Sequence, residues 1–415
     1  MLWGKTGALG IGAFVVIVGC GSEDTRPAGA TCGDGTCNWW EGSSSCPSDC
    51  PAVCGNGVCD PGEDFTSCPE DECSCDACPA VGATRCNGDV IESCTEAEDG
   101  CLHWVELEDC TSSAGVCRFV TDDAVCMVCD GGVWDGSYEI TDAASLAALE
   151  GYTAISGGLR VDEDSDLTSL SGLDCLQSID GGLYVNFSSL TSLDGLNGLT
   201  SIGEGLWIGY CDCGSALWDG GNHSLVSIDG MNALSSVGGD LTIMANSALT
   251  RVHGLRALTW IGGSLIIGRT GPIYGCAWNP ALSSLDGFGA LSSIGGEFLI
   301  GNDDSLTSLE CFSALTTVGG TVSIRDNALL ARLVGLDAIS SIGGSLEIVV
   351  NDALWSLDGL DGLTDVGENL LIDRNSALPT CEAADLLDQL AAFDGSVCIQ
   401  GNLPDTCADD PSGCP

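Results

Sequence analysis

Apolar and polar residues follow one pattern that recurs nine times between Leu159 and Ile372. The clearest copy, from Leu241 to Ile261, reads LTIMANSALTRVHGLRALTWI. The copies begin at Leu159, Leu183, Leu206, Leu241, Leu265, Phe298, Val322, Leu346 and Leu370, with successive spacings of 24, 23, 35, 24, 33, 24, 24 and 24 residues. A period in the twenties is typical of a solenoid, whose units bury their apolar faces only by stacking on one another.

Each copy predicts a short strand followed by several corners. An L-x-I strand comes first, and apolar residues then follow at every third position, as at Leu249, Val252 and Leu255. A period of three is neither helical nor a strand alternation, and it predicts a flattened coil whose corners turn inward repeatedly. A Gly-Gly or related pair, such as Gly262-Gly263, precedes most strands and permits the turn into the next coil.

A polar residue recurs three positions after the second apolar residue of the strand. These residues are Asn246, Asn327, Asn351 and Asn375, with Asp164 and Asp303 at the same place. We expect Asn side chains stacked at this corner to bond backbone groups of neighbouring turns.

At these residues the chain resembles the receptor L-domain, the leucine-rich-like solenoid of insulin-receptor and epidermal-growth-factor-receptor ectodomains. The resemblance covers about residues 131–400 and rests on the recurring pattern G-G-x-L-x-I-x-x-N-x-x-L-x-x-L. It implies a mainly β, right-handed parallel β-helix of about nine coils. It also implies a binding module for proteins, peptides or wall components rather than an enzyme. No binding residue is implied by position, because that family shares a framework and not a site.

The end of the solenoid, which we place at 131–380, predicts a helical cap within 381–415. Apolar residues stand at helical spacing at Leu386, Leu387, Leu390 and Phe393. The acidic residues at the start of this segment suit a helix N-terminus. A disulfide from Cys381 to either Cys398 or Cys407 would hold the helix over the last coil.

The N-terminus predicts a secretory signal over residues 1–20. Its apolar run, preceded by the single Lys5, is too short to span a membrane. The sequence IVGC at its end resembles the bacterial lipobox, which implies lipidation of Cys20 and a tether over 21–31. Gly21, rather than Asp, follows this Cys, and by resemblance that favours the outer membrane of a Gram-negative bacterium, with display at the cell surface. A plain signal peptide with a chance Cys is the alternative.

The 27 cysteines of an exported chain predict disulfides. The intervals C-x4-C-x8-C-x3-C and C-x4-C-x8-C-x4-C predict two tandem modules over 32–73, which resemble modules of secreted myxobacterial proteins. A third disulfide-rich module is expected over 74–130, where alternation from Leu102 to Leu107 predicts a strand in a hairpin. A Cys129–Cys175 bridge would join it to the first coil.

Metal binding is the alternative use of these modules. Some cysteine spacings would suit zinc, but an oxidised chain with only three His favours disulfides. Carboxylates that could offer oxygens to Ca²⁺ are Asp34, Glu41, Asp49, Asp60, Glu63 and Asp71. Acidic turns are usually just solvated, so we expect neither a metal site nor a cofactor.

The formal charge is −49, from 60 acidic and 11 basic residues. This balance argues against nucleic acid and against an anionic membrane surface, because both need clustered cations. It suits either a cationic partner or solubility in salty water, and we favour solubility. Catalysis is not expected, because the sequence lacks a nucleophile elbow, a His-Glu-x-x-His motif and a phosphate loop, and its three His lie in different regions.

The middle residue of each L-x-I strand should face away from the core. In the second to sixth copies these residues form a row that we call the apolar stripe: Tyr184, Trp207, Thr242, Ile266 and Leu299. An outward apolar row of this kind is typical of an interaction surface.

The two long spacings insert loops just after Ile208 and Ile267. Their aromatic residues are Tyr210, Trp218, Tyr274 and Trp278. Such residues would either join the stripe in a binding site or fold down and cover it. The sequence thus predicts a surface lipoprotein that recognises an unidentified protein or polysaccharide ligand. A structural envelope spacer or adhesin without a discrete ligand site is the alternative.

Overall fold

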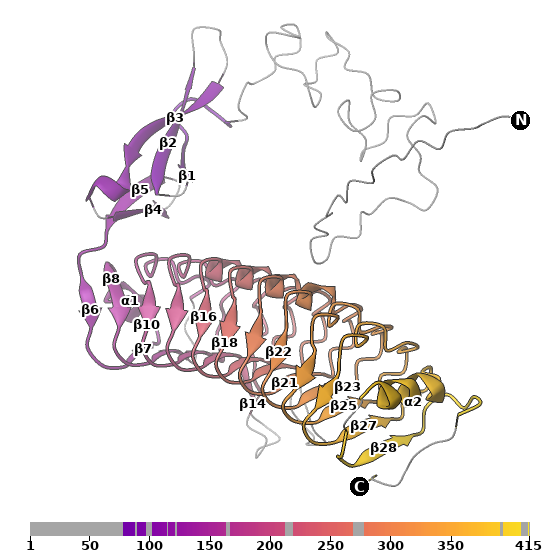
Figure 1. Cartoon of the computed structure of the whole chain (residues 1–415). Helices are drawn as coiled ribbons and strands as arrows, with labels where there is room; N and C mark the ends of the chain where they lie inside the picture. The colour runs from indigo at the N-terminus through magenta and orange to yellow at the C-terminus, as the bar shows by residue number, and fades with distance from the viewer. Residues whose placement is uncertain are drawn as a thin grey trace, which may run out of the picture.

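The computed structural model describes residues 78–87, 89–96, 102–113, 115–120, 123–162, 167–211, 219–268, 278–390, 393–407 and 414. The expected signal, tether and tandem modules (1–73) lie outside these ranges, as do Asp164, Trp218 and Tyr274. The described part is mainly β and forms an elongated stack of coils with a small β module at one end (Figure 1). This confirms the expected parallel β solenoid.

One face of the solenoid is an eleven-stranded parallel sheet. In order along the sheet, its strands are β7 (Tyr138–Ile140), β9 (Leu159–Val161), β11 (Leu183–Val185), β13 (Leu206–Ile208), β17 (Leu241–Ile243), β19 (Leu265–Gly268), β21 (Phe298–Gly301), β23 (Val322–Arg325), β25 (Leu346–Val349), β27 (Leu370–Asp373) and β28 (Val397–Gln400). The first apolar residues of the nine sequence copies are paired in register from Leu159 to Leu370. The sheet extends beyond the nine copies by β7 and β28, which follow Asp-Gly-Ser and so lack the Gly-Gly pair.

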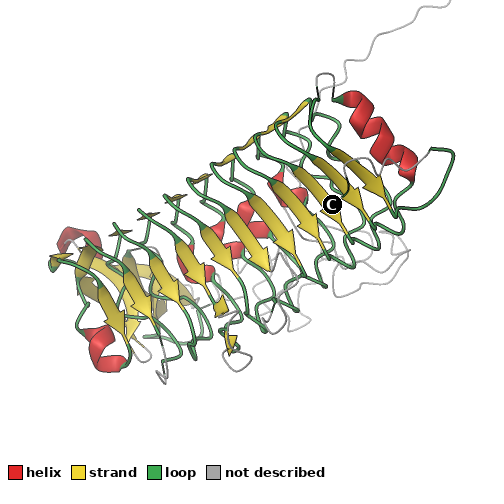
Figure 2. Ribbon diagram, turned by 90° about the horizontal axis from the view of Figure 1, so that it is seen from below, coloured by secondary structure: helices red, strands yellow, loops and turns green. Residues whose placement is uncertain are grey.

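A second parallel sheet of ten strands forms the neighbouring face (Figure 2). Its strands are β6 (Gly132–Trp134), β8 (Tyr152–Ile155), β10 (Ser178–Ile179), β12 (Ser201–Ile202), β16 (Ser236–Val237), β18 (Trp260–Ile261), β20 (Ser293–Ile294), β22 (Thr317–Val318), β24 (Ser341–Ile342) and β26 (Asp365–Val366). We expected corners here and not a sheet. Most of these strands have two residues, which is too short for an alternating pattern to reveal them.

The remaining side of the middle coils carries short 3-10 helices. They are η2 (Asp229–Met231), η3 (His253–Leu255), η4 (Asp286–Phe288) and η5 (Glu310–Phe312). In the clearest copy only Leu255 lies within a 3-10 helix (η3), and Leu249, Val252 and Leu258 lie at the turns before and after it, so the period of three follows the successive corners of the coil. Leu249, Val252, Leu255 and Leu258 are all fully buried and belong to one continuous core.

The C-terminal end of the solenoid is capped by α2 (Thr380–Gln389), as expected (Figure 1). Ala383 and Leu386 are its buried apolar residues. Of the two alternative bridges, the Cys381–Cys407 disulfide forms, while Cys398 bonds Cys414.

The N-terminal end of the solenoid is closed by aromatic residues and a short helix. Asp142 is the N-cap of helix α1 (Ala143–Ala147), and its side chain accepts a hydrogen bond from the Ser145 backbone amide. Trp134 packs edge-on against Tyr138 and Tyr152, with ring centroids 4.6 and 5.4 Å apart.

The β module before the solenoid is held by disulfides. It contains β1 (Thr84–Asn87), β2 (Val90–Glu96), β3 (Leu102–Asp109), η1 (Cys110–Ser113), β4 (Gly115–Val120) and β5 (Asp123–Val128). The predicted hairpin strand is β3, which pairs antiparallel with β2. The bridges are Cys78–Cys94, Cys86–Cys117 and Cys110–Cys126, so these cysteines are not zinc ligands.

A disulfide and an ion pair join the described part of this module to the solenoid. The Cys129–Cys175 disulfide forms as expected. Arg118 also makes an ion pair of 2.8 Å with Glu150. In the described part of the chain, no helix combines the length and apolarity that crossing a membrane requires.

Candidate ligand-binding site on the strand face

The middle residues of the eleven-stranded sheet face outward, as expected. In β11, for example, Leu183 and Val185 are fully buried and Tyr184 between them is half-buried. The apolar stripe is not uniformly exposed, however. Trp207 and Ile266 are half-buried like Tyr184, whereas Thr242 is only 4 % and Leu299 only 9 % exposed. Of the five stripe residues, Thr242 and Leu299 are therefore buried and the other three are partly exposed.

The exposed part of the face contains a stack of three side chains, which we call the arginine–aromatic stack. Register pairing of β9, β11 and β13 places Arg160, Tyr184 and Trp207 side by side. The two rings lie parallel, with centroids 4.5 Å apart and planes within 2°. The Arg160 guanidinium lies 5.1 Å from the Tyr184 centroid and makes a 2.9 Å ion pair with Asp162.

Glycines determine how the two rings lie. A Cβ on Gly205 would stand 2.1 Å from Trp207 Cη2, and a Cβ on Gly182 would stand 3.0 Å from atoms of both rings. Each ring therefore lies over the glycine two positions before it in the sequence, Gly182 for Tyr184 and Gly205 for Trp207. The Gly-x-aromatic spacing in the sequence could have revealed this arrangement.

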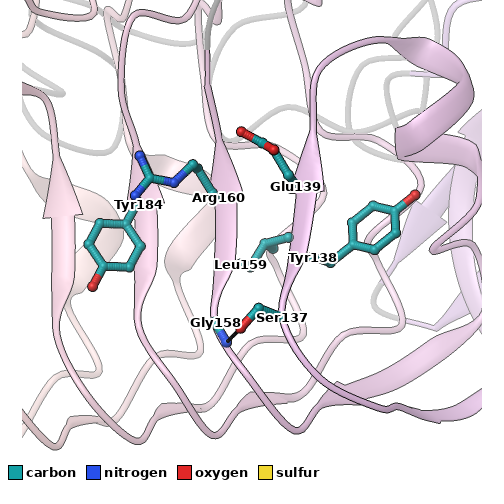
Figure 3. Close-up of a pocket in the computed structure, with 7 residues that line it drawn as sticks. All are labelled: Ser137, Tyr138, Glu139, Gly158, Leu159, Arg160 and Tyr184. Atoms are coloured by element: carbon teal, nitrogen blue, oxygen red, sulfur yellow. Dashed lines mark hydrogen bonds between the residues drawn. The ribbon is translucent and has the colours of Figure 1, made fainter.

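A hollow of about 390 Å³ lies at the Arg160 end of the stack, beside Tyr184 (Figure 3). Its lining residues are Ser137, Tyr138, Glu139, Gly158, Leu159, Arg160 and Tyr184. Ser137 and Gly158 form its narrow side, where the Gly158 amide donates to Ser137 Oγ at 3.0 Å. Sequence reasoning missed Ser137 and Glu139, because β7 lacks the glycine pair that marks most of the other strands and lies before the first copy of the repeat.

The opposite half of the same face is polar and internally paired. The Arg325 guanidinium makes an ion pair with Glu347, and Ser323 Oγ donates to the same carboxylate at 3.0 Å. These groups satisfy one another across β23 and β25. The part of the face best suited to a ligand is therefore its N-terminal half.

The loop aromatics are only partly described. Trp278 is 37 % exposed. Tyr210 begins the short strand β14 (Tyr210–Cys211), which pairs with β15 (Asp219–Gly220). Whether these loops bind a ligand or cover the stripe stays a prediction, since Trp218 and Tyr274 lie outside the described residues.

The expected asparagine row is confirmed and is longer than the sequence suggested. Its buried members are Asn222, Asn246, Asn279, Asp303, Asn327, Asn351, Asn375 and Asn402. Asn246 shows the bonding pattern, since its Nδ2 donates to Ile208 O at 3.0 Å and its backbone amide donates to Asn279 Oδ1 at 3.1 Å. This asparagine ladder holds adjacent coils in register at a corner that no solvent reaches.

Two other polar groupings were considered as chemical sites. Among the described residues, the one cluster with metal-ligand geometry is Cys381, Asp405 and Cys407, and its two sulfurs form a disulfide. His253, at an exposed corner, pairs through Nδ1 with Asp286 at 3.3 Å in the next coil. Arg256 lies 3.3 Å from the other ring nitrogen, so the imidazole is held between two partners.

The chain matches no protein-family model, and comparison with curated proteins and with solved structures finds no similar one. The receptor L-domain resemblance therefore rests on the repeat pattern and stays a prediction.

Proposed function

We propose that this protein is a surface lipoprotein whose solenoid recognises a ligand at the N-terminal half of its strand face. The observation that carries this proposal is the arginine–aromatic stack beside the hollow. Two rings already fixed against each other lose little entropy when a ligand binds, and so they make an efficient contact surface. A purely structural rod has no need of such a surface, and positions of the same row further along carry Ser323 and Glu347.

Export is supported by the several disulfides of the described residues. The proposal adds lipidation at Cys20, a tether over 21–31 and a location at the outer membrane. The disulfide-rich modules would then hold the solenoid away from the membrane. A right-handed, receptor L-domain-like coil without catalytic activity is part of the same proposal, and the ligand is a protein or a polysaccharide.

The alternative is an envelope spacer without a discrete ligand site. The burial of Thr242 and Leu299 favours it, because two of the five residues of the predicted apolar stripe are covered. The two functions differ in what Trp207 does: in a spacer, this residue contacts no partner.

The deciding experiment is capture of material from intact cells and isolated envelopes by the chain lacking residues 1–20. A Trp207→Asp variant is compared with Trp260→Asp, a matched control at a 44 % exposed Trp on the second sheet. We expect capture by the parent and the control, and loss of capture by Trp207→Asp with unchanged thermal unfolding. Equal capture by all three, or by none, would leave the spacer as the function.

A further inference from the structure

The hollow beside Tyr184 has the chemistry of a site for a neutral sugar. We infer that the arginine–aromatic stack and the hollow together bind one ring of an uncharged polysaccharide. This inference rests on the proposed recognition function and names its ligand class. It is argued from the geometry of the stack, from the polar groups around the hollow and from charge.

The geometry places the Tyr184 ring at the edge of the hollow. Trp207 covers one face of the Tyr184 ring, and the hollow is lined by β7 and β9 on the opposite side. The Arg160 guanidinium lies 5.1 Å from the centroid of the Tyr184 ring and lines the same hollow, so a ligand contacts the ring beside that guanidinium. The C–H face of a pyranose packs well on such a ring, which Trp207 holds rigid from behind.

The rim of the hollow supplies donors and acceptors for sugar hydroxyls. Arg160 offers N–H donors, exposed Glu139 offers carboxylate oxygens, and Ser137 offers a hydroxyl. Gly158, beside Ser137, adds no side chain, so a sugar ring can approach the backbone closely. A volume of about 390 Å³ lies at the lower end of the range of small-ligand sites.

Charge disfavours an anionic ligand, and the Arg160 guanidinium stands where a cationic ligand would contact the Tyr184 ring. Arg160 is the only cation among the residues lining the hollow, and it is already paired with Asp162. The chain carries a net charge of −49, so a polyanion such as a uronic-acid polymer is repelled. A cationic peptide would meet the Arg160 guanidinium against the Tyr184 ring. A neutral ligand with hydroxyl groups is neither repelled by the negative net charge of the chain nor opposed by the Arg160 guanidinium.

The test is isothermal titration of the purified full chain with cellohexaose, mannohexaose and a β-1,3-linked glucose hexamer. We expect one of these neutral oligosaccharides to bind, and Tyr184→Ala to weaken its Kd by about tenfold or more. Tyr184→Phe keeps the ring and should bind within about threefold of the parent. Ser137→Trp fills the hollow and leaves Tyr184 and Trp207 unchanged. This variant should abolish binding, so it tests the inference even if Tyr184→Ala misfolds.

The matched control is Trp355→Ala. Arg332 lies 4.1 Å from the Trp355 ring, and that Trp is 45 % exposed, so it is a similar arginine–aromatic pair away from the hollow. The control variant should bind like the parent.

Several outcomes would overturn the inference. They are tighter binding of an oligogalacturonate, binding of peptides in place of sugars, equal binding by Ser137→Trp, or no binding of any neutral oligosaccharide. If envelope capture still depends on Trp207 after such a result, the neutral-sugar ligand is rejected and the proposed recognition function is kept. If capture does not depend on Trp207 either, both the sugar ligand and the recognition function are rejected.

Discussion

Asp303 occupies a position in the asparagine ladder where an ionised carboxylate cannot donate the hydrogen bonds that an amide donates. Asn279 Nδ2 donates to its Oδ1 at 3.3 Å, but within the described part Oδ2 has no hydrogen-bond partner. At the next position Asn327 Nδ2 donates to Ile300 O and to Asn351 Oδ1, which an ionised Asp cannot imitate. Burial raises the pKa of Asp303 to about 7, and the charge of Asp304 adds to the rise.

This raised pKa predicts a pH-dependent stability. The folded-state pKa is about 7 and the ordinary value is 3.8, so between these values the folded chain keeps a proton that the unfolded chain loses. The free energy of unfolding contributed by Asp303 should therefore fall as pH rises from about 4 to about 7, and level off above it. Asp303→Asn should remove this dependence and raise stability at pH 8 by about 1 to 3 kcal/mol.

Urea unfolding of the parent and of Asp303→Asn at pH 4, 5.5, 7 and 8 measures this effect. The difference between the two chains isolates Asp303 from all other carboxylates, and it should grow with pH. A difference that is constant across the range would show that Asp303 titrates normally.

At the scale of single elements, the first glycine of each pair sets how closely the coils stack. A Cβ on Gly238 would lie 2.0 Å from Gly203 O in the preceding coil, and the same close approach recurs at Gly262, Gly295 and Gly319. These residues are glycines because backbone passes against backbone there. Sequence analysis related the pair to a turn, whereas the structure shows that stacking requires it.

Gly238→Ala should lower the free energy of unfolding by about 2 kcal/mol or more, because one coil must move away from the next. Gly289→Ala is the matched control: it lies in a right-handed helical conformation with no atom within 4 Å of an added Cβ. That change should be neutral, or stabilise by up to about 1 kcal/mol. Equal effects of the two substitutions in urea unfolding would contradict this role of the glycine pair.

At the scale of the whole molecule, the described architecture suits display of a rigid surface. The solenoid core is continuous from Ile140 to Ile399 and both of its ends are closed, by α2 at one end and by the Trp134 cluster at the other. A disulfide and an ion pair fix the N-terminal β module to the first coils. The proposed binding site lies near this junction, on the same early coils.

The proposed lipid anchor predicts where the chain is found in the cell. Cys20→Ala should abolish incorporation of radiolabelled palmitate and release the protein from the membrane fraction, because the anchor is lost. A Cys32→Ala variant, which removes a cysteine of the expected first module, is the control and should still be labelled. Absence of label from the parent chain would favour the plain signal peptide, and unchanged labelling of Cys20→Ala would place the lipid on another residue.

The sequence by itself determined the parallel solenoid, the register of its strands from Leu159 to Leu370, the asparagine ladder and the capping helix. These features follow from periodic local patterns, which repeat because every coil solves the same packing problem. It missed the second sheet, whose strands are too short to alternate, and the flanking strands β7 and β28.

Tertiary structure alone decided the candidate site. The parallel stacking of Tyr184 on Trp207, the hollow that Glu139 helps to line, and the burial of Thr242 and Leu299 depend on which coils are neighbours and on what covers them. The raised pKa of Asp303 is decided in the same way, because it follows from burial among the amides of adjacent coils. Such contacts join residues more than twenty positions apart, and of these the local Gly-x-aromatic spacing points only to how the two rings lie.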